Sequence, residues 1–172
     1  MSTKTVERLT GFFGSDLDDL CDATDAAIID GIGFTWIQVP PRERLETYWR
    51  GVLVVPEREL FVCRVDGTIA GSVQLVKPTP HNEAGAFTAS LTTHFIAPWT
   101  RGHGLATALL VAVENAAKSQ GYSILKLNVR ETQEAAIQLY QKRGYVRWGT
   151  MPYFAKLEGG FVAGHYYYKE LK

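Results

Sequence analysis

The segment from Phe87 to Gln120 constrains the fold of this 172-residue chain most strongly. It begins with β-branched and large apolar residues, which are typical of a strand, and it then turns through a glycine-containing stretch, Trp99–Gly104. The residues after the turn place apolar side chains at helical spacing, and Gly121 suits the C-terminal cap of that helix. The segment therefore predicts a strand, a glycine turn and a helix.

The predicted turn has the features of a binding site for a phosphate-bearing ligand. Gly102 and Gly104 let a ligand approach the backbone closely, and the helix start supplies unpaired N–H groups and a positive dipole end. A Walker loop would need Lys and then Ser or Thr where Leu105 and Ala106 stand. The dinucleotide fingerprint fails at Thr107, which occupies its third small-residue position. A glycine turn without any ligand is the structural alternative.

The spacing R-x-x-G-x-A remains, formed by Arg101, Gly104 and Ala106. It resembles the pyrophosphate-binding motif of the GCN5-related N-acetyltransferase (GNAT) family. The apolar-x-Pro stretch Ile96–Pro98 resembles the strand end that this family places before the motif.

A second strand and helix carry the same resemblance. Ser123–Arg130 is predicted to be a strand, and a helix follows that ends at Gly144. The stretch AIQLYQKRGY, from Ala136 to Tyr145, is similar to the family segment A-I-x-L-Y-x-K-x-G-F. Gln133 stands where the family commonly has Asn. Together with the ending of the chain, these blocks also resemble the branch that includes the tabtoxin-resistance acetyltransferase.

The predicted order of elements is strand, two helices, three strands, helix, strand, helix and two strands, which indicates an α/β protein with a mixed sheet. The resemblance implies the GNAT acyltransferase fold in a single domain over residues 1–172: a largely antiparallel sheet of about seven strands, flanked by about four helices. Two loops are expected, at Asp30–Pro41 and Leu157–Gly164. The first carries Phe34 and Trp36, and the second connects the last two strands.

The resemblance implies acetyl-coenzyme A (acetyl-CoA) as cosubstrate and no metal ion. Its diphosphate would accept hydrogen bonds from the backbone of the glycine turn, and its pantetheine arm would pair with an exposed strand edge. Phe95 and Ala97 are the expected backbone partners of the arm, with Ile96 between them. The cofactor-binding residues predicted in this way are Phe95, Ile96, Ala97, Arg101, Gly102, His103, Gly104, Leu105, Ala106, Thr107, Asn128, Gln133 and Tyr140.

Acetyl transfer to an amine requires a proton to leave the amine and a proton to reach the departing thiolate. Tyr140 matches the tyrosine that supplies the second proton in the family, although a core aromatic residue is the alternative reading. The central strand has no carboxylate to act as base. By strand alternation, Ser90, Thr92 and His94 share a face with Ile96. His94 is a candidate base because histidine titrates near neutral pH, and Ser90 or Thr92 could hold a relay water instead.

Composition and charge argue against a nucleic-acid binder, a cysteine metal site and a membrane-spanning protein. The 18 basic and 18 acidic side chains balance, which argues against a nucleic-acid binder. Cys21 and Cys63 have no metal-site spacing, and no apolar run resembles a signal peptide or a membrane span. We expect a cytosolic protein that contacts neither membrane nor nucleic acid and that is a monomer or homodimer.

Aromatic residues predict the position of the acceptor pocket. The expected acceptor is the primary amine of a small, amino acid-like molecule or antimetabolite. Acetylation of a protein Lys or N-terminus, and a regulatory domain that binds acetyl-CoA without catalysis, are the alternatives. The aromatic residues expected at the pocket are Phe34, Trp36, Tyr48, Trp49, Tyr153 and Phe154.

Overall fold

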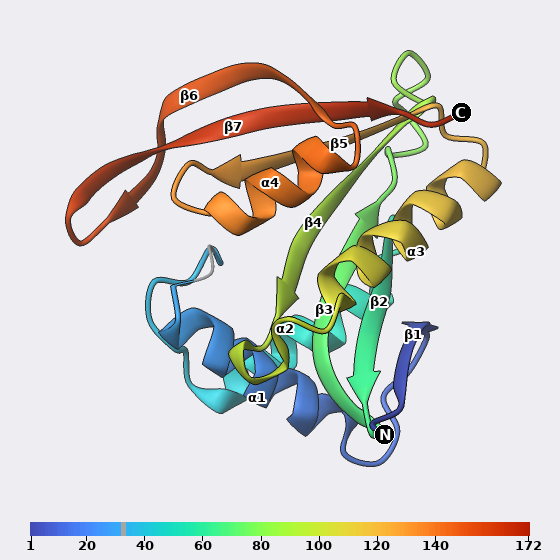
Figure 1. Cartoon of the computed structure of the whole chain (residues 1–172). Helices are drawn as coiled ribbons and strands as arrows, with labels where there is room; N and C mark the ends of the chain where they lie inside the picture. The colour runs from blue at the N-terminus through green and yellow to red at the C-terminus, as the bar shows by residue number, and fades with distance from the viewer. Residues whose placement is uncertain (32–33) are drawn as a thin grey trace.

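In a computed structural model that describes residues 1–31 and 34–172, seven strands form one sheet, and four α-helices cover its two faces (Figure 1). The order of strands is β1-β2-β3-β4-β5-β7-β6, which confirms the predicted mixed sheet. The strands are Lys4–Leu9 (β1), Arg58–Val65 (β2), Thr68–Val76 (β3), Thr88–Ile96 (β4), Ile124–Arg130 (β5), Val146–Leu157 (β6) and Gly160–Glu170 (β7). The helices are Asp16–Ile29 (α1), Arg42–Val54 (α2), Leu105–Ser119 (α3) and Glu134–Lys142 (α4), with a 3₁₀ turn at Pro98–Thr100.

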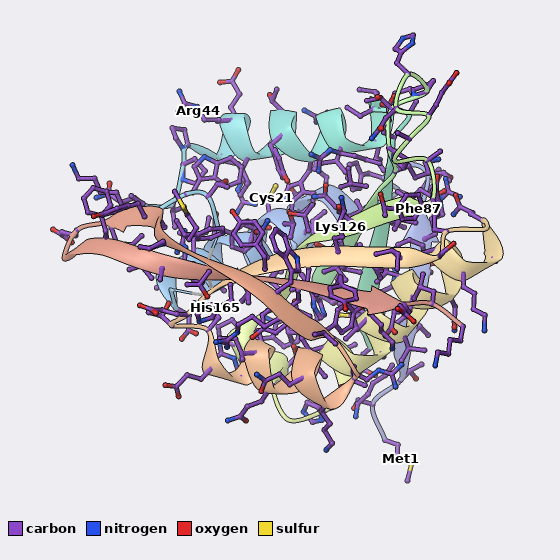
Figure 2. All side chains as sticks on the ribbon, turned by 90° about the horizontal axis from the view of Figure 1, so that it is seen from above. Met1, Cys21, Arg44, Phe87, Lys126 and His165 are labelled. Carbon is purple, nitrogen blue, oxygen red and sulfur yellow. The ribbon has the colours of Figure 1, made fainter. Side chains whose placement is uncertain are left out.

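Two hydrophobic cores lie on opposite faces of the sheet. Leu20 of α1 and Leu45 of α2 pack against Leu60 and Val62 of β2 in one core. The other core joins α3 and α4 to the opposite face of the same strands. Figure 2 shows this layering from above, with α2, which carries Arg44, on one side of the sheet and α4 on the other.

The centre of the sheet opens where β4 and β5 part. These two strands run parallel and pair only through Thr88–Ser90 and Ile124–Lys126. Beyond Ser90, β4 continues along β3 while β5 continues along β7, so the facing edges of β4 and β5 separate (Figure 1). The fold therefore contains an exposed strand edge, as the family resemblance implied.

A bulge in β4 overturns the predicted alternation of its side chains. Thr93 has a positive φ of 51°, which is rare for a β-branched residue, and the register with β3 shifts at this point. Leu91 and Ile96 consequently belong to the core under α3, whereas Phe95 belongs to the core under α1 and α2. The prediction that Ser90, Thr92 and His94 share one face with Ile96 is wrong, because the bulge reverses the alternation between Thr92 and His94.

The last two strands are longer than the sequence pattern predicts. β6 reaches Leu157 and β7 begins at Gly160, so Glu158 and Gly159 alone form the turn between them. The predicted loop at Leu157–Gly164 is wrong. Gly160 has a φ of 120°, which a side chain would disfavour, and this permits the tight hairpin. In the Asp30–Pro41 loop, which has no helix or strand in its described part, residues 32–33 lie outside the described residues.

Candidate active site

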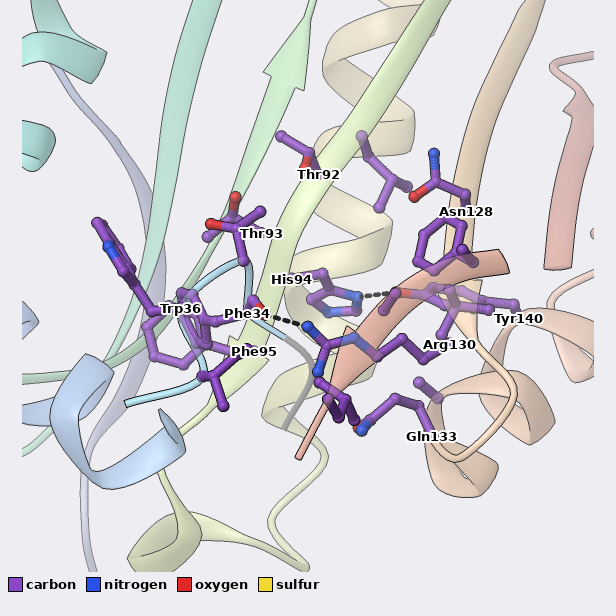
Figure 3. Close-up of a pocket in the computed structure, with 18 of the residues that line it drawn as sticks. Phe34, Trp36, Thr92, Thr93, His94, Phe95, Asn128, Arg130, Gln133 and Tyr140 are labelled. Atoms are coloured by element: carbon purple, nitrogen blue, oxygen red, sulfur yellow. Dashed lines mark hydrogen bonds between the residues drawn. The ribbon is translucent and has the colours of Figure 1, made fainter. Parts of the chain in front are cut away.

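A cavity of about 590 Å³ occupies the opening between β4 and β5 (Figure 3). Its walls come from both separated strands, from the loop after α1, from α2 and α4, and from the hairpin of β6 and β7. Among the residues predicted for the site, His94, Phe95, Asn128, Gln133 and Tyr140 line this cavity. Ser90 does not line it, because β4 is still paired with β5 at that residue.

The open edge of β4 presents the backbone of Ile96. The Ala97 N–H donates to the Ala70 carbonyl over 2.7 Å, and the Ala97 carbonyl accepts from the Thr100 N–H. The Phe95 carbonyl also points toward β3, because a Cβ placed on Gly71 would collide with it. Backbone groups alternate in direction along a strand, so those of Ile96 face the separated edge. The prediction that Phe95 and Ala97 present their backbone groups there is wrong by one residue.

The predicted glycine turn forms the start of α3. Gly102 and Gly104 have φ values of 82° and 74°, in the left-handed region that favours glycine. Leu105 begins the helix, and no side chain in the described part of the chain caps its first turn. The first N–H groups of α3 are therefore available to an external acceptor. The sequence predicted this arrangement correctly.

Three polar side chains near this turn hold the loop that follows α1. The Arg101 guanidinium pairs with the Asp30 carboxylate, and Gln133 donates to the Gly31 carbonyl over 2.9 Å. Arg130, at the end of β5, donates to the Phe34 carbonyl (Figure 3). Burial lowers the pKa of the Arg130 guanidinium. No motif in the sequence marks Arg130, whose one signal is a charge at the end of an apolar strand.

His94 and Tyr140 form a hydrogen-bonded pair inside the cavity (Figure 3). The His94 Nδ1 atom lies 2.9 Å from the Tyr140 Oη atom, and His94 Nε2 lies 2.9 Å from the Ala106 carbonyl oxygen. A carbonyl only accepts, so Nε2 carries the proton and Nδ1 accepts the Tyr140 hydroxyl hydrogen. The pair thus connects the centre of the cavity to the first turn of α3.

Burial moves the pKa values of both groups away from neutrality. It lowers the pKa of His94 to about 4, and it raises the pKa of Tyr140 above its ordinary value. At neutral pH the imidazole is uncharged and the phenol keeps its proton. His94 is therefore a weak base, with both ring nitrogens already bonded to the protein.

Arg58 and aromatic rings form the other end of the cavity. The Arg58 Nη1 atom donates to Gln74 Oε1 over 2.6 Å, and Gln74 Nε2 donates to the Tyr48 hydroxyl over 3.0 Å. Trp36 packs edge-on against Tyr48, with ring centroids 5.0 Å apart. Of the predicted aromatic residues, Phe34, Trp36, Tyr48 and Phe154 line the cavity, whereas Trp49 is buried in the core and Tyr153 is exposed.

Residues 25–145 match the model of the acetyltransferase (GNAT) family. The chain belongs to the GNAT family of acetyltransferases. It is 59% identical over 133 residues to an N-acetyltransferase from the hisH-hisA intergenic region of Azospirillum brasilense, covering 77% of this chain and 79% of that one. The fold is similar to an N-acetyltransferase of Staphylococcus aureus Mu50, with a TM-score of 0.84, 20% identity and coverage of 99% of both chains.

This GNAT protein also has the fold of YncA from Salmonella typhimurium, whose structure contains its cofactor acetyl-CoA. The TM-score is 0.76 at 14% identity, with 98% of this chain and 94% of YncA covered. The protein is thus an acetyl-CoA-dependent N-acetyltransferase. Within residues 1–31 and 34–172, no cluster of three His, Cys, Asp or Glu side chains is arranged to bind a metal. No helix there has the length and apolar character needed to span a membrane.

Proposed function

We propose that this acetyltransferase acetylates the primary amine of a small molecule. The observation that carries this proposal is the walled cavity between β4 and β5, which brings the His94–Tyr140 pair and an aromatic end into one space, with His94 bonded to the first turn of α3 directly after the glycine turn. A cavity of about 590 Å³ lies within the range of small-ligand sites, which is roughly 300–1,000 Å³. Acetylation of a protein Lys or N-terminus, the alternative, requires an open groove for a chain.

In this proposal, acetyl-CoA binds along the open edge of β4. The pantetheine arm pairs with the backbone of Ile96, which faces the edge, between Phe95 and Ala97. Its diphosphate accepts hydrogen bonds from the turn and from the first turn of α3, and Arg101 leaves Asp30 to add its charge. The residues of this diphosphate site are Arg101, Gly102, His103, Gly104, Leu105, Ala106 and Thr107. Asn128 and Gln133, on the opposite wall, contact the arm.

Tyr140 supplies a hydrogen bond to the departing sulfur in our proposal. The amine attacks the thioester carbonyl directly, a tetrahedral intermediate forms, and the carbon–sulfur bond then breaks. A tyrosinate is disfavoured where burial raises the pKa of the phenol, so Tyr140 stabilises the developing thiolate while largely keeping its proton. His94 is a positioning residue, because its unprotonated Nδ1 holds the Tyr140 hydroxyl in place until the single hydroxyl hydrogen turns to the developing thiolate.

The amine loses its proton to water in this mechanism. The lining of the cavity contains no Asp or Glu in the described part of the chain, and His94 is too weak a base near neutral pH. Thr92 and Thr93 line the cavity and offer hydroxyls to hold a relay water, whereas Ser90 lies outside it. The missing carboxylate therefore leaves the proton of the amine to water.

The proposal also covers the acceptor class, the cellular location and the oligomeric state. An amino acid-like acceptor is consistent with the resemblance to the tabtoxin-resistance branch, and we propose that the protein acts in the cytoplasm as a monomer or homodimer. The test is release of coenzyme A from acetyl-CoA with a panel of small amines, a Lys-containing peptide and a peptide with a free N-terminus. Turnover with small amines alone supports the proposal. Turnover with peptides alone contradicts it, and so does binding of acetyl-CoA without turnover of any amine in the panel.

A further inference from the structure

The lining of the cavity is positively charged, although the chain as a whole is balanced. The chain has 18 basic and 18 acidic side chains, yet the cavity is lined by Arg58, Arg130 and Lys156 and by no carboxylate from the described residues. Such a cavity attracts anions and repels a simple ammonium ion. An amine acceptor that enters it therefore needs a negative group of its own.

Arg58 is the cation best placed to receive that negative group. Among the described residues, the only side-chain hydrogen bond of Arg58 goes to Gln74, a fully buried neutral side chain that Tyr48 holds in turn. No carboxylate of the described chain lies within ion-pair distance of Arg58, and the undescribed residues 32–33 are Ile and Gly. A guanidinium has five N–H donors, so most of those of Arg58 remain for a ligand.

The other two cations of the cavity have different surroundings. Arg130 is already directed at the Phe34 carbonyl, where it holds the loop after α1. Lys156 lies over the Phe161 ring at 5.7 Å on the outer hairpin. Arg130 is thus held by a backbone carbonyl of the loop, whereas Arg58 is held by a buried side chain, Gln74.

The sheet register separates Arg58 from the diphosphate turn. Arg58 lies opposite Val76, and Val76 lies opposite Ser90, so Arg58 is level with the paired end of β4. The turn follows the other end of β4, beyond Ile96. Ile96 lies six positions after Ser90 along the strand, which corresponds to about 20 Å. Arg58 thus belongs to the acceptor end of the cavity and not to the diphosphate end.

We propose that Arg58 binds an anionic group of the acceptor, so that the substrate is an amine that also carries a carboxylate or a comparable anion, as an amino acid does. This inference rests on the proposed function and specifies its substrate class. Gln74 and Tyr48 are positioning residues that hold the guanidinium edge toward the cavity. The same positive charge favours the neutral form of the acceptor amine, which assists attack where no protein base is available.

The test compares matched amines. An amino acid, its carboxamide and the amine that lacks the carboxyl group are assayed with the wild-type enzyme and with Arg58→Met. The wild type should use the amino acid with the highest kcat/KM. In Arg58→Met this value should fall by roughly 10- to 100-fold, the loss expected for a hydrogen-bonded charge, while the KM for acetyl-CoA and the kcat/KM for the carboxamide stay within about twofold.

Two further variants make the result specific. Arg50→Met removes an exposed Arg of α2 that pairs with Glu46, and it should leave the selectivity unchanged. Gln74→Leu keeps the charge of Arg58 but removes its support, and it should lower selectivity for the amino acid over the carboxamide. Equal use of neutral and anionic amines by the wild type, or unchanged selectivity in Arg58→Met, overturns this inference alone. Failure to acetylate any amine, with acetyl-CoA bound, overturns the proposed function as well.

Discussion

The glycine turn, where we place the diphosphate, and the acceptor end of the cavity are constructed in different ways. The proposed diphosphate site is made of backbone from one continuous segment, in which Gly102 and Gly104 shape the turn before α3. The acceptor end is made of side chains from separate elements, with Arg58 on β2, Gln74 on β3 and Tyr48 on α2. A backbone site recognises a group common to all acyl-CoA molecules, whereas a side-chain site can change its specificity by single substitutions.

The His94–Tyr140 pair lies between these ends and connects them. Tyr140 lines the cavity, and His94 reaches from it to the Ala106 carbonyl in the first turn of α3. Catalysis should therefore depend on this pair, cofactor binding on the turn and substrate choice on the acceptor end. The following predictions test that division.

The largest effect is expected at Tyr140. Tyr140→Phe keeps the ring that packs against Tyr145 and removes the hydroxyl that we place beside the reacting sulfur. We expect kcat to fall by about 10- to 1,000-fold, with the affinity for acetyl-CoA little changed, because the lost interaction acts in the transition state. Steady-state kinetics and calorimetric titration with acetyl-CoA measure the two quantities.

Tyr145→Phe is the matched control for this change. The Tyr145 hydroxyl is buried, and it has no hydrogen-bond partner among the described residues. Its removal should leave kcat unchanged and should not lower the melting temperature, because an unpaired buried hydroxyl stabilises nothing. A Tyr140→Phe enzyme with wild-type kcat would reduce Tyr140 to a packing residue.

The next largest effect is expected at the glycine turn, on the binding of acetyl-CoA. Acetyl-CoA should raise the melting temperature of the wild type, because it binds the folded state. Gly104→Ala should lose most of this increase, since its Cβ would point into open space where we place the diphosphate. Gly121→Ala, at the other end of α3, has a similar positive φ and also open space, so it reports the backbone strain alone. If acetyl-CoA raised the melting temperature of both variants equally, the diphosphate would have to bind elsewhere.

The contrast between the two ends also explains what the sequence could predict. The turn is local: its glycines, the strand before it and the helix after it are adjacent in the chain, and the sequence predicted them correctly. The acceptor end brings together residues that are distant in sequence, and no local pattern marks Arg58 or Gln74. The bulge at Thr93 escaped prediction because a β-branched residue rarely adopts a positive φ. That one residue puts Ser90 and Thr92 on the face opposite to His94 and Ile96.

Gly71 tests how much the close approach of β3 and β4 beside this bulge matters for stability. A Cβ at Gly71 would collide with the Phe95 carbonyl and touch Ile96, which are backbone neighbours that cannot move freely. Gly71→Ala should lower the free energy of unfolding by about 1–3 kcal/mol. Gly149→Ala, in β6, meets no atom within 4 Å and should have a much smaller effect in the same denaturant titration. Similar losses in both variants would contradict a special role of this contact.

The smallest kinetic effect is expected at His94. Burial lowers its pKa to about 4, so the imidazole stays neutral between pH 6 and 9, and its titration cannot produce a limb near pH 6.5. We expect log(kcat/KM) to rise through the pKa of the acceptor amine. His94→Gln should leave that limb in place and lower kcat only several-fold, because Tyr140 loses part of its orientation. A limb near pH 6.5 that disappears in His94→Gln would identify His94 as the base.

The same variant has a distinct effect on stability. Because the folded pKa of about 4 lies below the unfolded value of 6.5, the unfolded chain takes up a proton between these pH values that the folded chain does not. The stabilisation is complete above pH 6.5 and is lost as pH falls toward 4. His94→Gln removes this contribution, so its melting temperature should fall less than that of the wild type over this range. Parallel curves of melting temperature against pH would show that His94 titrates normally, and its role as a base would then be open again.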